Sequence, residues 1–181
     1  IMSTFRIENQ WGGNKKPWHP GGVWILGARD NQNVIAMHFK SADGGQTFTG
    51  MMNYKGEGPI GLRGTKTSEN TYTVENQWGG DHAPWHPGGQ WVIGGRANQN
   101  VIAMSVKTRN GGLSLSGTMT YAGEGPIGIK VQMVPSYSVE NQWGGNHAPW
   151  HKGGDWVLGA RDNQNVVAIN IKSPDNGETF T

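Results

Sequence analysis

The chain is organised around the stretch Glu8-Asn9-Gln10-Trp11-Gly12-Gly13, which returns as Glu75 to Gly80 and again as Glu140 to Gly145. Its tryptophans, Trp11, Trp78 and Trp143, lie 67 and 65 residues apart, and the motifs Pro-Trp-His, Gly-x-Arg and Asn-Gln-Asn follow at matching offsets. A period of this length is too long for the helical units that build solenoids. The sequence therefore predicts three copies of one unit, each with several strands.

Composition narrows the possible classes of protein. The net charge is only +2, and the lysines and arginines are scattered over all copies, so no basic stripe indicates nucleic acid. Cysteine is absent, which excludes disulfides and thiolate metal sites. The N-terminal residues have no apolar signal-peptide core, and no window has the apolar length of a membrane span. We expect a soluble protein without membrane insertion, located in the cytoplasm, although the sequence leaves secretion open.

Alternating and β-branched segments bounded by turn residues predict about five strands in each copy. In the first copy we expect strands at Phe5–Trp11, Val23–Arg29, Val34–Phe39, Gln46–Tyr54 and Leu62–Thr65. Pro-Trp-His and the following Gly-Gly pair are typical of a loop. Asp43-Gly44-Gly45, with its equivalents Asn110-Gly111-Gly112 and Asp175-Asn176-Gly177, is typical of a hairpin turn. No segment has the period of an amphipathic helix.

An all-β fold follows, and its edges indicate how the copies combine. A five-stranded unit has two open edges, so two copies are expected to close into one compact antiparallel β-barrel of about ten strands. We predict a barrel domain at 1–133, with copy one at 1–67 and copy two at 68–133. Copy three, 134–181, is incomplete and is expected to begin a second barrel. Val166–Ile171 is predicted to be an apolar strand without a pairing partner. We therefore expect copy three to be completed by further residues or by strand exchange with another chain.

Two kinds of residue are candidates for binding. A tryptophan followed by two glycines offers a flat ring beside accessible backbone amides, which suits a pyranose sugar. We assign Trp11 and Trp78 to binding, and Trp18, Trp24 and their equivalents mainly to packing. Arg29 and Arg96 are bidentate donors for hydroxyls. The corresponding acceptors are Glu57 and Glu124, and a purely structural Arg–Glu ion pair is an equally good interpretation of these four residues.

Catalysis and metal binding have weaker support in the sequence. Glycoside hydrolysis needs two carboxylates in different environments, whereas Glu57 and Glu124 are repeat equivalents. Glu8, Glu75 and Glu140 lie within strands and are expected to make buried structural bonds. A carbohydrate-active hydrolase, or its non-catalytic sugar-binding module, remains the alternative. Neither a cofactor motif nor ligand spacing for a metal is present, and His19, His86 and His151 are interpreted as loop residues.

The ordered strings Glu-Asn-Gln-Trp-Gly-Gly, Ala-Pro-Trp-His-x-Gly-Gly, Asn-Gln-Asn-Val and Met-Thr-Tyr-Ala-Gly-Glu-Gly-Pro-Ile-Gly resemble the Oscillatoria agardhii agglutinin family of lectins across essentially the whole chain. The resemblance implies a ten-stranded barrel made of two repeats. It also implies binding to the branched core of high-mannose N-glycans, with agglutination and with antiviral activity through viral envelope glycoproteins.

The resemblance further implies composite sites, each taking Trp-Gly-Gly from one copy and the arginine and Glu-Gly from the other. One site would consist of Trp11, Gly12, Gly13, Arg96, Glu124 and Gly125. The second would consist of Trp78, Gly79, Gly80, Arg29, Glu57 and Gly58. Copy three keeps Trp143, Gly144, Gly145 and Arg161 without a Glu-Gly partner. Lys15-Lys16 before Pro17 is a departure from the family pattern that bears on affinity.

Overall fold

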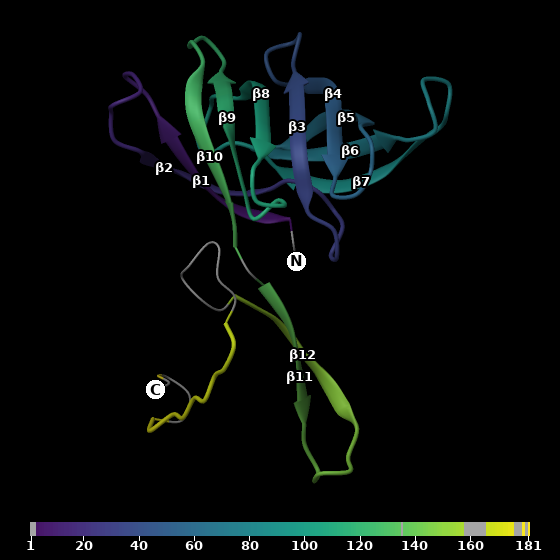
Figure 1. The fold of residues 1–181 in the computed structure, drawn as a ribbon, viewed down its shortest axis with the longest axis vertical. Coiled ribbons are helices and arrows are strands. Elements are labelled where there is room, and N and C mark those ends of the chain that lie inside the picture. The colour runs from purple at the N-terminus through teal and green to yellow at the C-terminus, as the bar shows by residue number, and fades with distance from the viewer. Residues whose placement is uncertain (1–2, 135, 158–165, 176–178, 180) are drawn as a thin grey trace.

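The computed structural model describes residues 3–134, 136–157, 166–175, 179 and 181. These residues form twelve strands and no helix, and so no helix long and apolar enough to cross a membrane. The strands are β1 (Thr4–Gln10), β2 (His19–Ile25), β3 (Val34–Lys40), β4 (Thr47–Tyr54), β5 (Ile60–Ser68), β6 (Thr71–Gln77), β7 (Trp85–Val92), β8 (Val101–Thr108), β9 (Ser114–Tyr121), β10 (Ile127–Met133), β11 (Ser136–Gln142) and β12 (Trp150–Val157). The first ten form a closed barrel, and β11 and β12 form a separate hairpin (Figure 1).

The barrel closes by exchanging strands between the first two copies. Its order is β1-β10-β9-β8-β3-β4-β5-β6-β7-β2, with β2 pairing back to β1. The first two strands of copy one therefore lie against β10 of copy two, while the first two strands of copy two lie against β5 of copy one. All these pairs are antiparallel. The predicted fold class is confirmed, and no copy forms a contiguous sheet of its own.

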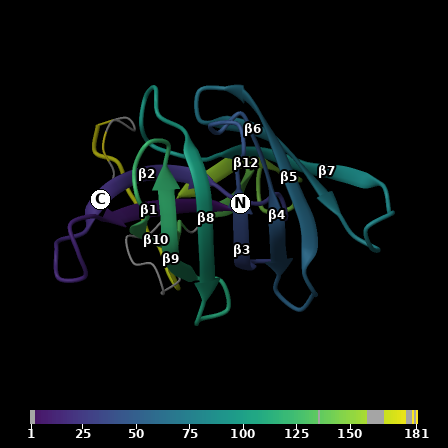
Figure 2. The ribbon, with the colours of Figure 1, turned by 90° about the horizontal axis from the view of Figure 1, so that it is seen from above.

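The exchange places the two tryptophan loops far apart. The loop between β1 and β2 carries Trp11, and the loop between β6 and β7 carries Trp78. Figures 1 and 2 both show these loops projecting from opposite ends of the barrel. Any ligands bound at the two loops are therefore well separated and face in different directions.

Side chains from both copies fill the interior, as the alternation predicts. Phe5 and Ile7 of β1 are each 1% exposed, and the next inward position holds Asn9. The Asn9 amide donates to the Met119 sulfur at 3.3 Å, so this polar group has a partner in copy two. Burial of large apolar side chains from both copies in one core stabilises the barrel.

Two tryptophans anchor this core. Trp24 and Trp91 have 0% exposure, which confirms the packing role predicted for them. Each indole N–H donates to a backbone carbonyl three residues earlier, Gly21 at 3.0 Å and Gly88 at 2.9 Å. Such a bond satisfies the one polar group of a buried indole.

The predicted second strand was wrong at both ends. β2 begins at His19, so the Pro-Gly-Gly expected in a loop belongs to the strand, and it ends at Ile25, before Arg29. The register with β1 shifts between Ile7 and Glu8, a bulge that accommodates Pro20 in a strand. The same shift occurs in the β6–β7 and β11–β12 pairs, so it is a property of the repeated sequence.

Copy three differs from the other copies in what it exposes. The β11–β12 hairpin has the same paired register as β1–β2. Trp156, the equivalent of buried Trp24, is 37% exposed, and Ile169, the equivalent of buried Met37, is 56% exposed. Residues 166–171 form no strand, so the strand predicted there was wrong. That copy three begins a second barrel stays a prediction.

Gly50 and Gly117 lie where the backbone of the neighbouring strand leaves no room for a side chain. A Cβ on Gly50 would overlap the His38 carbonyl oxygen of β3, and a Cβ on Gly117 would overlap that of Ser105. Because both contacts are with backbone, neither can be relieved by a rotamer change. Glycine is therefore required at these positions of β4 and β9.

We expect Gly50→Ala to lower the free energy of unfolding by about 1–3 kcal/mol, as overpacking does. Denaturant unfolding followed by tryptophan fluorescence measures it. Gly58→Ala is the control, because a Cβ at Gly58 meets nothing within 4 Å. Equal stability of the two variants would contradict the tight β3–β4 contact.

Candidate functional site

The Trp-Gly-Gly loop of copy one is held rigidly from behind. Trp11, 44% exposed, stacks on His19 with ring centroids 3.8 Å apart and planes at 14°. The Gln10 side chain donates to the carbonyls of Asn14 and Lys16, at 3.1 and 2.7 Å, and so closes the loop. The imidazole covers one face of the indole and leaves a fixed, exposed aromatic surface.

The other copies repeat this arrangement. Trp78 stacks on His86 at 3.7 Å, and Trp143 stacks on His151 at 3.5 Å, both with planes at 14°. Interpreting these histidines as loop residues was wrong, because His19, His86 and His151 lie in the strands. The signal in the sequence was the constant spacing of eight residues between each tryptophan and its histidine.

The paired glycines serve both conformation and access. Gly12 and Gly13 have φ values of 89° and 107°, a backbone region that residues other than glycine rarely adopt. Similar values occur at the equivalent positions Gly79, Gly80, Gly144 and Gly145. A Cβ at Gly13 or Gly80 would meet nothing within 4 Å. The backbone beside each exposed indole is therefore open to an approaching ligand.

The predicted arginine and glutamate are brought together with a third residue. The Arg29 Nη1 donates to Glu57 Oε2 at 2.7 Å, while its guanidinium carbon lies 4.1 Å from the Tyr54 ring centroid. Gln32 accepts from Arg29 Nη1 at 2.5 Å and donates through Nε2 to Glu57 Oε2 at 2.6 Å. Sequence reasoning missed Gln32, although it belongs to the repeated Asn-Gln-Asn motif.

Copy two builds the same triad. Arg96 Nη1 donates to Glu124 Oε2 at 2.7 Å and to Gln99 at 2.8 Å, and Gln99 donates to Glu124 at 2.6 Å. The hydrogen bond from Gln99, together with Arg96, holds the pKa of Glu124 below its ordinary value. Gln32 and Arg29 lower the pKa of Glu57 in the same way. Both carboxylates are therefore ionised at neutral pH. The side chains of Glu57 and Glu124 are also partly exposed to solvent.

Strand register places each tryptophan loop beside the loop of the other copy that holds the triad glutamate. Gln10 pairs with Gly128, which places Trp11 beside the start of β10 and the preceding loop that holds Glu124 and Gly125. Gln77 likewise pairs with Gly61. Trp78 thus lies beside the loop with Glu57 and Gly58, and a Cβ at Gly58 or Gly125 would meet nothing within 4 Å.

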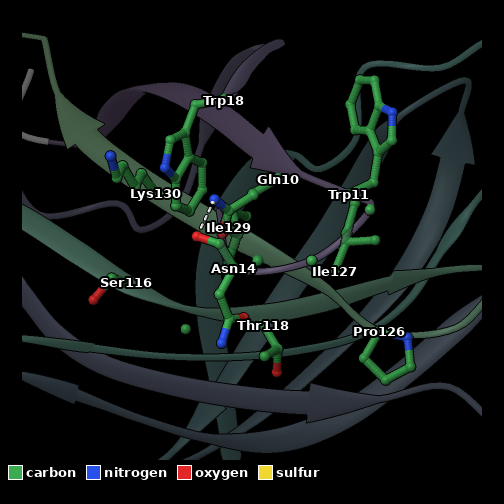
Figure 3. A pocket seen from close by; sticks show the side chains of 14 residues that line it. Gln10, Trp11, Asn14, Trp18, Ser116, Thr118, Pro126, Ile127, Ile129 and Lys130 are labelled. Carbon is green, nitrogen blue, oxygen red and sulfur yellow. Dashed lines mark hydrogen bonds between the residues drawn. The ribbon is translucent and has the colours of Figure 1, made fainter. Parts of the chain in front are cut away.

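A cavity of about 640 Å³ lies beside the first of these junctions, and its lining includes Trp11 but not Arg96, Glu124 or Gly125. Figure 3 shows Trp11 at one end and Trp18 with Lys130 at the other, with Pro126 of the copy-two loop below Trp11. The lining includes Gly12 and Gly13 and the outward-facing residues of β9 and β10. The volume is that of a small-molecule or oligosaccharide pocket.

Three other sequence interpretations can be compared with the structure. Glu75 accepts from Arg63 at 3.0 Å but its side chain is 41% exposed, so its bond is structural without being buried. Among the described residues, no group of three or more metal-ligand side chains occurs. In copy three the structure describes the loop of Trp143, Gly144 and Gly145. No Arg–Gln–Glu triad faces this loop within the described residues, and the predicted Arg161 lies outside them.

We expect Gln32→Ala to raise the pKa of Glu57 toward its ordinary value of 4.5 and to leave Glu124 unchanged. Stabilisation from a lowered carboxylate pKa is present above the ordinary value and is lost as pH falls through the lowered one. Carboxyl ¹³C NMR titration measures the pKa values of Glu57 and Glu124. The matched control is Gln99→Ala, which should raise the pKa of Glu124 and leave that of Glu57 unchanged. Equal shifts of both glutamates in either variant would refute the local origin.

We expect His19→Ala to make the Trp11 ring more mobile. The substitution should also lower the free energy of unfolding by about 0.5–1.5 kcal/mol, the contribution of a stacked aromatic pair. In His19→Ala, ¹⁵N relaxation of the indole N–H groups should report increased motion at Trp11 and unchanged motion at Trp78. In His86→Ala the increase should occur at Trp78 and not at Trp11. An unchanged Trp11 signal would show that stacking does not hold the ring.

Comparisons with known proteins agree with this geometry. The domain described as "OAA-family lectin sugar binding domain" matches residues 3–67, 70–134 and 135–181. Myxobacterial hemagglutinin of Myxococcus xanthus is 58% identical over 182 residues, 99% of this chain and 68% of that protein. Lectin OAA of Planktothrix agardhii is 58% identical over 128 residues, 71% of this chain and 97% of that protein.

Solved structures give the same result. The Burkholderia oklahomensis agglutinin matches with a TM-score of 0.73 and 60% identity, covering 98% of this chain and 64% of that one. The Myxococcus xanthus hemagglutinin in complex with α3,α6-mannopentaose matches with a TM-score of 0.72 and 58% identity, covering 98% of this chain and 68% of that one. The chain belongs to the OAA family of lectins.

Proposed function

We propose that each composite site binds the branched mannose core of a high-mannose N-glycan. The observation that supports this proposal is that the loop of the exposed Trp11 indole lies beside the loop of the other copy that holds Glu124 of the Arg–Gln–Glu triad, with backbone open at Gly13 and Gly125. A pyranose has an apolar face that stacks on an indole and hydroxyls that need charged or amide partners. The mannopentaose bound to the related hemagglutinin supports this ligand class.

Two such sites at opposite ends of the barrel would make the protein multivalent. The loops that carry Trp11 and Trp78 project in different directions, so one barrel would bridge two glycans on separate glycoproteins. Agglutination follows from bridging. Binding to the dense mannose glycans of viral envelope glycoproteins, with antiviral activity, is the extension of the same proposal.

We propose that the sites bind without catalysis, cofactor or metal. Glu57 and Glu124 have equivalent arginine and glutamine partners, and both pKa values are lowered, whereas a hydrolase needs one acid and one base. In the proposed arrangement the two glutamates also belong to different sites. A hydrolase acting on the same glycans is the alternative that these observations disfavour.

A glycan array in the presence of a chelator tests the proposal. We expect binding restricted to high-mannose structures and unchanged by the chelator. Release of free mannose from the array glycans would identify a hydrolase, and loss of binding with the chelator would identify a metal requirement. If the protein bound no glycan on the array, the proposed lectin function would be contradicted.

We expect Glu57→Ala to weaken mannopentaose binding at the Trp78 site by roughly 1.5–3 kcal/mol, the value of a hydrogen bond to a charged group. Binding at the Trp11 site should stay unchanged. NMR titration observed at the two indole N–H signals separates the sites, and Glu124→Ala is the matched control with the opposite pattern. A loss confined to the Trp11 site in Glu57→Ala would refute the composite assignment.

A further inference from the structure

The two complete sites share their tryptophan, arginine and glutamate but differ in the charges around them. Five corresponding positions hold Asn14, Lys15, Lys16, Ala97 and Lys130 at the first site, and Asp81, His82, Ala83, Asp30 and Arg63 at the second. The first set contains three lysines and no carboxylate. The second contains two aspartates and one arginine. The repeat therefore preserves the contacts to sugar while it changes the electrostatic potential of the site.

Lys16 lies directly on the first binding loop. A Cβ at Gly12 would meet the Lys16 Cγ at 3.2 Å and its Cε at 3.8 Å, so the aliphatic stem runs along the glycine beside Trp11. The same place is taken by the Ala83 methyl next to Gly79. Of these two positions, only that of the first site therefore holds a lysine against the glycine that follows the exposed tryptophan.

Lys130 places a second ammonium in the cavity that Gly12 and Trp11 line. Its amino nitrogen lies 4.1 Å from the Trp18 ring centroid, at the end of the cavity that Trp11 also lines (Figure 3). Glu8 is opposite Lys130 in the strand register, yet the ion pairs found in the described part of the chain do not include Lys130. The ammonium stands over an aromatic face rather than on a carboxylate.

The equivalent cation of the second site is neutralised. Arg63 donates to Glu75 at 3.0 Å and its guanidinium lies 4.2 Å from the Trp85 centroid. Lys55, near Glu57 in the sequence, has its amino group 3.2 Å from the position of a Cβ on Gly111, in the β8–β9 turn. The second site therefore has no counterpart to the Lys16 and Lys130 pair among the residues described.

We infer that the first site selects mannose glycans that carry an anionic substituent, such as a phosphomonoester on a terminal mannose, whereas the second site takes neutral ones. This inference rests on the proposed function. A glycan seated on Trp11 that extends along this cavity reaches Lys130, and Lys16 lies against Gly12 of the same lining, so an anionic group there is attracted by both cations. At the second site the same group would meet Asp81 and Asp30 and be repelled.

The test compares mannopentaose with the same sugar phosphorylated on a terminal mannose. Indole N–H signals of Trp11 and Trp78, assigned with the Trp11→Phe and Trp78→Phe variants, report each site in one titration. At low salt we expect the phosphorylated sugar to bind the first site about fivefold more tightly than the neutral sugar, and the second site no more tightly. About 0.5 M NaCl should remove the difference, because it screens exposed charges.

Charge swaps locate the effect. Lys16→Met keeps the stem on Gly12 and should reduce the phosphate preference of the first site by about two- to fivefold. Ala83→Lys should raise the preference of the second site by a similar factor. The ratio of the two affinities is the readout, so a change that affects both sugars equally does not count as support.

The outcomes separate this inference from the proposed function. If neutral mannopentaose shifts both tryptophans but phosphorylation changes neither affinity, or changes both equally, the inference is overturned and the lectin function stands. If neutral mannopentaose shifts neither tryptophan, the proposed function fails and this inference fails with it. A salt-sensitive preference at Trp11 that Lys16→Met lowers supports it.

Discussion

The antiparallel pairing of β1 with β10, repeated by β6 with β5, is the constraint on which the rest of the structure depends. It sets Gln10 opposite Gly128 and Gln77 opposite Gly61, so the loop that follows each first strand meets the loop that precedes each fifth strand of the other copy. Glycine at these two positions leaves room for the Trp18 and Trp85 rings, whose Cη2 atoms lie 3.3 Å from an added Cβ. The pairing that closes the barrel is therefore also the one on which the proposed sites depend.

Rigidity of the site comes from residues behind the surface that a ligand would contact. His19 supports the Trp11 ring, Gln10 closes its loop, and Gln99 fixes the geometry between Arg96 and Glu124. Each holds an exposed group in place before a ligand arrives, which lowers the entropy lost on binding. The surface ion pairs are a third to nearly half exposed, so they contribute to orientation more than to stability.

Much of the fold was predictable because repetition and alternation are local signals. The strand predicted at Val34–Phe39, which in the structure ends one residue later at Lys40, the hairpin after it and the burial of Trp24 followed from pattern alone. The start of β2 was missed because Pro20 and a Gly-Gly pair have loop propensity, which pairing with β1 overrides through a bulge. The strand exchange and the partners of Gln32 and His19 depend on contacts between distant residues, and their only trace in the sequence was constant spacing across copies.

Composite sites are tested most directly by a crystal structure of this protein with mannopentaose. Each bound sugar should contact a Trp-Gly-Gly loop of one copy and the arginine, glutamate and second glycine of the other, Trp11 with Arg96 and Glu124, and Trp78 with Arg29 and Glu57. A sugar held by residues of a single copy, or bound away from both tryptophans, would contradict the shared sites.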